Sequence, residues 1–281
     1  MKRRKALDRR REIQIVCESF TPLKAHSFFE YIRRSKQLAF LWLLLKENPN
    51  RNKDELVQRV LQVKGLLGKN NDRTLRENIQ KNIQVLANWF KLVNMVRGLK
   101  ETKFNKENEE HRAALEELWN SLTDKQENIW KEWKDIGFQG KDPSTDFRGA
   151  GWLSLLQLIY FAKKYNSLCT KILYNCNTSV PNYPFACTGI YCTQALTNLL
   201  EQGILLPLQE QESNENELLE IFHEEYVRLF LLFHHTWRQG NPENLLEFEK
   251  YMEKTIQLAK DKLREKGTIL TAEELKNSSY S

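Results

Sequence analysis

Residues 137–151 read GFQGKDPSTDFRGAG, and residues 152–165 directly after them read WLSLLQLIYFAKKY. The first string is dense in Gly, Pro, Asp and Ser, which predicts a turn-rich loop. The second string is apolar on nearly all sides, and a helix of that kind is buried in the middle of a domain. The junction therefore predicts a loop that is held in place by a central helix.

Helical periodicity continues from this junction in both directions. We expect helices over residues 26–46, 54–67, 74–98, 110–121, 124–135, 187–202, 218–238 and 242–265. No alternating strand pattern is present, so the fold class is predicted to be all-α. The expected organisation is an N-terminal helical region over 1–99, a single compact multi-helix domain over 100–265, and a frayed tail over 266–281. The longest apolar run, 38–45, is too short for a membrane span and is predicted to be a buried helix.

The net charge of +6 comes from one end of the chain. Residues 1–11 carry seven Lys or Arg residues against the single Asp8, and the remaining 270 residues are formally neutral. No folded basic face is implied, which argues against nucleic-acid binding. The basic head has three interpretations: an import signal, an anchor on a membrane surface, or a solvated helix start. No apolar segment follows closely enough for a secretory signal, so a cytoplasmic location is expected.

Motifs for metal binding and catalysis are missing from the sequence. The five cysteines form no C-x-x-C pair, and their odd number without a secretory signal predicts free thiols. His223 and Glu224 begin a two-histidine zinc pattern that Val227 breaks. No nucleophile has an evident base. We therefore expect no metal, no cofactor and no active site that belongs to this chain alone.

The loop of residues 137–151 offers a charged side chain. Arg148 is expected to point outward, because burying an unpaired charge is costly. Two interpretations stay open from the residues alone. Arg148 either pairs with Asp146 or Asp142 and stiffens the loop, or it acts on a partner.

The neighbours of Arg148 suit a shaped loop. Asp142 and Pro143 fit the start of a helical turn, and Asp146 or Thr145 is predicted to cap the helix that follows. Gly149 and Gly151 lack side chains, so another surface can approach the backbone there.

The pattern WxxxGFQGxxPxTDFRGxG over residues 133–151 resembles the signature of the ELMO (engulfment and cell motility) domain family, in its GTPase-activating branch. Further segments that resemble the family are 160–162 (YFA), 183–186 (YPFA), 188–190 (TGI) and 246–248 (LEF). Together they cover roughly residues 100–265. One departure is Trp152, which stands where a smaller aliphatic residue is expected.

The resemblance implies an ELMO-type all-α domain that activates a small GTPase of the Arf or Arf-like family in its GTP-bound form. In the family, the arginine of the Asp-Phe-Arg-Gly string is the proposed finger, which corresponds to Arg148. Such an arginine stabilises charge that develops on the γ-phosphate, an effect of about 10³–10⁵ in rate. The resemblance assigns Gln139, Gly140, Asp146, Gly149 and Gly151 to shaping the loop or contacting the partner. Trp133 and Phe147 are expected to be packing residues.

Two further functions are consistent with the sequence. The domain could serve as a non-catalytic scaffold or effector that binds a GTPase, as the exchange-factor branch of the family does; that branch typically lacks the arginine. Residues 1–11 could also place the protein on the surface of an organelle membrane, in combination with either function.

Overall fold

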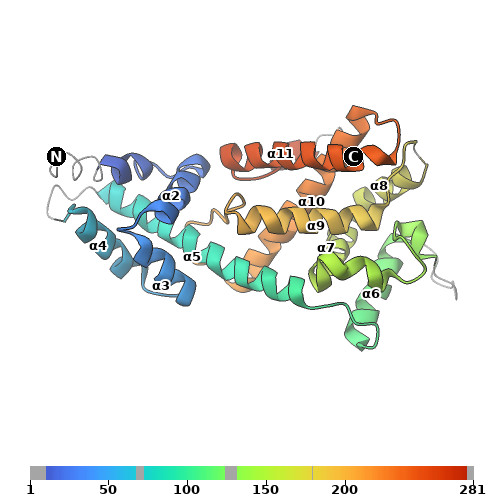
Figure 1. Cartoon of the computed structure of the whole chain (residues 1–281), viewed down its shortest axis with the longest axis horizontal. Coiled ribbons are helices and arrows are strands. Elements are labelled where there is room, and N and C mark those ends of the chain that lie inside the picture. The colour runs from blue at the N-terminus through green and yellow to red at the C-terminus, as the bar shows by residue number, and fades with distance from the viewer. Residues whose placement is uncertain (1–10, 68–72, 124–131, 179, 277–281) are drawn as a thin grey trace. The chain divides into compact units, whose positions relative to one another are not determined.

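The computed structural model describes residues 11–67, 73–123, 132–178 and 180–276. Within these ranges the regular elements are helices and no strand occurs, which confirms the predicted all-α class (Figure 1). Residues 11–16 are helical, and the elements after them are α2 (Pro22–Arg34), α3 (Ala39–Glu47), α4 (Lys53–Lys64), α5 (Arg73–Glu101), α6 (Glu109–Leu122), η1 (Trp133–Ile136), η2 (Pro143–Gly149), α7 (Gly151–Lys164), α8 (Asn166–Thr178), α9 (Phe185–Glu201), α10 (Glu215–Gly240), η3 (Leu245–Glu247), α11 (Phe248–Lys266) and α12 (Ala272–Lys276).

No helix in these ranges combines the length and the apolar character needed to cross a membrane. The basic head, apart from Arg11, lies outside the described residues. The five cysteines are free, as predicted, and all five are buried.

The described residues form two units. The first takes those up to Asn94, with Leu200–Leu218 and Leu263–Gly267. The second takes the described residues of Met95–Leu199 and Leu219–Lys262, with those from Thr268 onward.

The helices of the first unit start and stop where local chemistry dictates. Asn52 caps α4, because its side-chain oxygen accepts hydrogen bonds from the backbone N–H groups of Asp54 (2.9 Å) and Glu55 (3.3 Å). Gly65 ends the same helix in the left-handed conformation. The core of this unit includes an aromatic cluster in which the Trp89 ring meets Phe29 at 4.9 Å and Phe90 at 4.9 Å between centroids.

The single helix predicted over 26–46 is wrong, because the structure has two helices there. Ser35 ends α2 in an extended conformation, and the fully buried Leu38 anchors the turn before α3. The prediction that 38–45 is a buried helix is also wrong in part. Leu41 and Leu45 are buried, but Leu43 is 65% exposed, so α3 is a one-sided helix.

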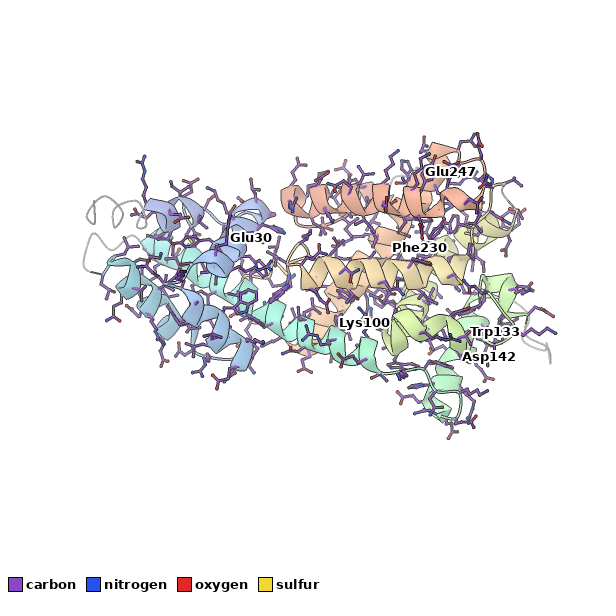
Figure 2. The ribbon with its side chains drawn as sticks, viewed as in Figure 1. Glu30, Lys100, Trp133, Asp142, Phe230 and Glu247 are labelled. Carbon is purple, nitrogen blue, oxygen red and sulfur yellow. The ribbon has the colours of Figure 1, made fainter. Side chains whose placement is uncertain are left out.

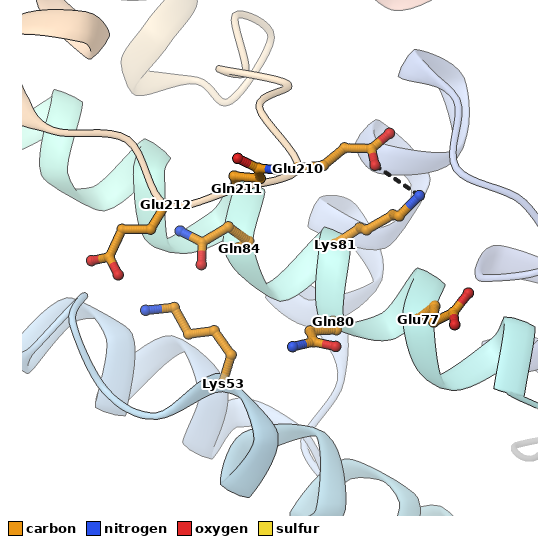
Figure 3. A pocket seen from close by; sticks show the side chains of 8 residues that line it. All are labelled: Lys53, Glu77, Gln80, Lys81, Gln84, Glu210, Gln211 and Glu212. Carbon is orange, nitrogen blue, oxygen red and sulfur yellow. Dashed lines mark ion pairs between the residues drawn. The ribbon is translucent and has the colours of Figure 1, made fainter.

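A polar hollow of about 430 Å³ lies in the first unit, where α5 faces the start of α4 and residues 210–212 (Figure 3). Its lining is charged or amide: Lys53, Glu77, Gln80, Lys81, Gln84, Glu210, Gln211 and Glu212. Lys81 pairs with Glu210 at 2.7 Å, and Lys91 pairs with Glu212 at 2.8 Å. These ion pairs fasten residues 210–212 to α5. Small-molecule sites are mostly apolar, so this lining favours a structural role.

The central helix of the second unit is α7. Leu153, Leu155, Leu158 and Phe161 have no exposed surface, which confirms the prediction of a helix buried on nearly all sides. The Phe161 ring packs on Phe230 of α10 at 5.3 Å between centroids. The loop that precedes α7 is therefore attached to a deeply buried helix.

Other segments of the second unit differ from the expectation. Sequence reasoning predicted no helix at α8, and the helix expected over 124–135 falls mainly on residues 124–131, outside the described residues. Instead of a frayed tail, Ile269 and Leu270 are fully buried. Glu225 holds this segment, because its carboxylate accepts from the Ile269 N–H at 2.8 Å and from the Thr268 hydroxyl at 2.6 Å.

Replacing His223 by phenylalanine is expected to make the protein less sensitive to acid. Burial lowers the pKa of His223 to about 4, its Nδ1 has no hydrogen-bond partner among the described residues, and its ring stacks on Tyr160 at 4.9 Å. The unfolded chain binds this proton near pH 6.5, so the wild type loses stability as the pH falls from about 6.5 towards 4. Phenylalanine keeps the stacking and cannot titrate.

The measurement for His223→Phe is urea unfolding at pH 7.5 and pH 5. The variant should match the wild type at pH 7.5 and should be about 2 kcal/mol more stable at pH 5. Parallel stability curves at the two pH values would contradict the assignment.

Candidate functional site

The loop begins with a capped turn. Asp142 accepts a hydrogen bond from the Ser144 N–H at 2.9 Å, and Pro143 occupies the first position of η2, which confirms the predicted start of a helical turn. Hydrogen bonds from Ser144 lower the pKa of Asp142. Its second interaction is an ion pair with Lys106 at 3.9 Å.

Asp146 closes the loop upon itself. Its Oδ2 accepts a hydrogen bond from the backbone N–H of Gln139 at 2.9 Å. The prediction that Asp146 or Thr145 caps α7 is therefore wrong, and Ala150 stands at the N-cap without a side-chain hydrogen bond. A backbone N–H group in the first turn of α7 finds its hydrogen-bond partner outside the loop, because the Trp152 N–H donates to the carbonyl of Thr102 at 2.7 Å.

The atoms that lie close to Gly149 and Gly151 belong to this chain. A Cβ at Gly149 would lie 1.9 Å from the Gln194 side-chain nitrogen. A Cβ at Gly151, where φ is +56°, would lie 2.1 Å from the Lys100 carbonyl oxygen. Gly140 differs from both, because a Cβ there would meet only the Asp142 nitrogen at 3.9 Å.

Aromatic rings in mutual contact pack against the loop. Phe147, the residue before Arg148, is 1% exposed and packs on Phe104 (5.0 Å) and Phe138 (5.5 Å). Phe138 in turn meets Trp133, which packs edge-on to Trp119 at 5.3 Å. These contacts confirm that Phe147 and Trp133 are packing residues. Figure 2 labels Trp133 of this aromatic cluster and Asp142 of the loop.

Trp152 belongs to the same packing system. It is 8% exposed, and its ring stacks on His111 at 4.1 Å with an angle of 14° between the planes. The bulky residue that departs from the family pattern is thus directed inward, away from any surface that a partner could touch.

Arg148 lies at the end of η2 and is exposed. Neither carboxylate that was considered as its partner holds it, because Asp146 binds Gln139 and Asp142 binds Ser144 and Lys106. Among the residues that the structure describes, Arg148 has no hydrogen-bond or ion-pair partner. The backbone on either side of Arg148 is held in place, because Phe147 is buried and Gly149 lies against the Gln194 side chain. The guanidinium group is free to meet another molecule.

A hollow of about 180 Å³ lies between this loop and α9. The loop contributes Gln139, Thr145 and Asp146, and α9 contributes Cys187, Ile190, Tyr191 and Gln194. Burial and the nearby Asp146 raise the pKa of the Cys187 thiol to about 12, so Cys187 stays a neutral, unreactive part of the wall.

The structure thus brings together Gln139, Asp146 and Gly149. Gly151 packs inward against residues 100–102, and Gly140 has open space where a side chain would stand. Sequence reasoning missed Tyr191 and Gln194. They sit at one-turn spacing on α9, but no local pattern links them to a loop some forty residues earlier. Among the described residues no group of three or more His, Cys, Asp and Glu side chains could hold a metal ion.

Comparison with known proteins shows which family the sequence is similar to. Residues 94–252 match the ELMO/CED-12 family. ELMO domain-containing protein 2 of Mus musculus is 32% identical over 189 residues, which cover 66% of this chain and 64% of that protein. ELMO domain-containing protein B of Dictyostelium discoideum is 34% identical over 166 residues, covering 56% of this chain and 57% of that protein.

A third relative, ELMO domain-containing protein 1 of Bos taurus, is 29% identical over 197 residues, covering 63% of this chain and 60% of that protein. The chain therefore spans about 60% of the length of the curated relatives it matches. No solved structure matches the chain.

Proposed function

The chain belongs to the ELMO/CED-12 family, and on that premise we propose that it is a GTPase-activating protein for a small GTPase of the Arf or Arf-like family. In this proposal Arg148 acts as an arginine finger in trans on the GTP-bound partner. The nucleotide and its magnesium ion belong to the partner, and this chain supplies no nucleophile and no cofactor.

The observation that carries the proposal is the state of Arg148. A guanidinium group that is exposed, without a described partner and mounted on a fixed backbone is prepared to donate hydrogen bonds to another molecule. Its planar set of N–H donors matches the geometry of phosphate oxygens. Charge that develops on the γ-phosphate during hydrolysis would be stabilised by this group, which lowers the barrier.

The rigidity of the loop supports the same function. Asp146 ties the loop to Gln139, Phe147 is buried among aromatic rings, and Gly149 is in contact with Gln194. A catalytic group that is already positioned loses little conformational entropy when the partner binds. The alternative is a non-catalytic scaffold or effector that binds a GTPase through the same surface. A location in the cytoplasm at an organelle membrane, reached through residues 1–11, stays a prediction.

The first test is single-turnover GTP hydrolysis by a panel of Arf, Arf-like and Rac-type GTPases with the wild-type protein. We expect acceleration by about 10³-fold or more for at least one Arf or Arf-like member, and none for the Rac-type members. The readout is release of phosphate against the concentration of this protein. Binding to a GTP-loaded member without acceleration would reject the activating function and favour the scaffold.

A further inference from the structure

We propose that the exposed apolar side chains Tyr191, Leu245 and Leu246, together with the hollow beside Arg148, form the surface on which the G domain of the GTP-bound partner docks. This inference rests on the proposed function and adds the surface that determines affinity. The partner is expected to present apolar side chains beside its nucleotide, with one hydrogen-bond donor, such as Lys or Arg, that enters the hollow.

Tyr191 is the centre of this docking surface. It lies on α9 and is 46% exposed. One side of it lines the hollow that contains Asp146, and its ring meets Phe248 of α11 at 5.3 Å. Tyr191 therefore connects the loop that carries Arg148 to the start of α11.

We assign Leu245 and Leu246 to the same surface because they directly precede Phe248, the ring that Tyr191 meets. They lie on η3, directly before Phe248, and are 45% and 93% exposed. The turn is well held, because Asn244 accepts from the Leu246 N–H at 2.9 Å and Glu247 accepts from the Glu243 N–H at 2.8 Å. Covering a leucine that is almost entirely exposed to water stabilises the complex with the partner.

Gln194 links Tyr191 to the loop that carries Arg148. Gln194 lies against Gly149 and, one turn along α9 from Tyr191, lines the same hollow. In the view of Figure 2, Asp142 of the loop and Glu247 of η3 are seen on opposite sides of α9. Tyr191 of this helix lines the hollow beside the loop and meets Phe248, the residue after η3. We therefore expect a molecule that brings a nucleotide to Arg148 to cover this segment as well.

The chemistry of the surface favours a protein over a lipid. Glu243, Glu247 and Glu249 lie within four residues of the exposed leucines along the chain, and Lys250 is a counter charge that pairs with Glu247 at 2.6 Å. An anionic membrane surface would be repelled by these carboxylates. Apolar side chains with a central Tyr, an adjacent Arg and a polar rim are typical of protein interfaces.

The hollow gives the partner a further requirement. Asp146 is its charged group, and one of its two carboxylate oxygens already accepts from Gln139. The amides of Gln139 and Gln194 and the hydroxyl of Thr145 complete a polar lining. A volume of about 180 Å³ accommodates one side chain, and the carboxylate favours a basic one.

The surface also provides a basis for recognising the GTP-bound state. The switch segments of small GTPases are ordered by the γ-phosphate and its magnesium ion. Apolar side chains held in those segments would be presented to Tyr191 and Leu246 only in that state. The surface is therefore expected to affect binding, while Arg148 affects the chemical step.

The test compares Tyr191→Ala and Leu246→Asp with matched controls in the full chain. Tyr174 on α8 is a tyrosine that is 66% exposed, and Leu258 on α11 is a leucine that is 38% exposed; both lie outside the docking surface. Hydrolysis by the responsive GTPase is measured for each variant. Binding of that GTPase loaded with a non-hydrolysable GTP analogue is measured in parallel.

We expect Tyr191→Ala and Leu246→Asp each to raise KM and the dissociation constant by about tenfold or more, with kcat within about twofold of the wild type. Tyr174→Ala and Leu258→Asp should leave all three unchanged. Unchanged KM in the first pair, a loss confined to kcat, or equal losses in the controls would overturn the docking surface. So would a wild-type dimer that Leu246→Asp dissociates.

The two proposals fail separately in this experiment. If the wild type binds a GTP-loaded GTPase through Tyr191 but accelerates no hydrolysis, the activating function fails and the docking surface stands. If the wild type accelerates hydrolysis and neither variant changes KM, the docking surface fails and the activating function stands.

Discussion

Replacing Arg148 by alanine is expected to reduce the GTPase-activating rate at saturation by about 10³-fold, to near the intrinsic rate of the partner. The side chain has no described partner inside this chain, so its removal leaves no buried group unsatisfied and should not lower stability. Binding of the GTP-loaded partner should weaken far less than the rate, because the transition state gains most from the guanidinium group.

Arg148→Lys is the conservative companion. Lysine keeps the charge but loses the planar set of donors, so it is expected to recover only a small part of the rate. Single-turnover hydrolysis at saturating concentration, together with thermal unfolding of each variant, is the measurement. Full activity of Arg148→Lys would show that a point charge is sufficient, and full activity of Arg148→Ala would remove the finger from the mechanism.

Replacing Gly151 by alanine is expected to destabilise the protein by about 3 kcal/mol. The backbone there has φ of +56°, and a Cβ would lie 2.1 Å and 2.6 Å from the carbonyl oxygens of Lys100 and Thr102. One of these, the Thr102 carbonyl, accepts the N–H of Trp152 and satisfies the start of α7. The substitution therefore strains the junction between the loop and the central helix.

Gly140→Ala is the matched control from the same loop. Its Cβ would meet only the Asp142 nitrogen, at 3.9 Å, so the change in stability should stay within about 0.5 kcal/mol. Urea unfolding of the two variants gives the comparison. Equal stability of both would contradict the close packing of Gly151 against residues 100–102.

The fold could be predicted where the apolar pattern of a single segment is enough to show that the segment is buried. The run from Trp152 to Tyr165 is apolar on nearly all sides, and it became the buried helix α7. Prediction was wrong where a local break decided the outcome. Ser35 ends α2 although the apolar pattern continues through it, because the pattern records burial and not the extended conformation that the chain adopts there.

The candidate site could be predicted only along the chain. The exposure of Arg148 and the capped turn at Asp142 follow from residues within the loop. The role of Asp146 could not be predicted in this way. Its position before α7 suggests a cap for that helix, but its carboxylate accepts a hydrogen bond from Gln139, seven residues earlier in the chain. Tyr191 and Gln194 belong to the site only because α9 packs beside the loop, and no spacing in the sequence predicts that packing.

The most direct test of Arg148 as a finger is its preference for the transition state. The responsive GTPase is loaded with GDP and aluminium fluoride, which imitates the transferring phosphoryl group, or with a non-hydrolysable GTP analogue. The dissociation constant of each form is measured with the wild type and with Arg148→Ala. We predict that the wild type binds the aluminium fluoride form at least about 10²-fold more tightly, and that Arg148→Ala loses this preference while it still binds the GTP-analogue form. An undiminished preference in Arg148→Ala would contradict the finger mechanism.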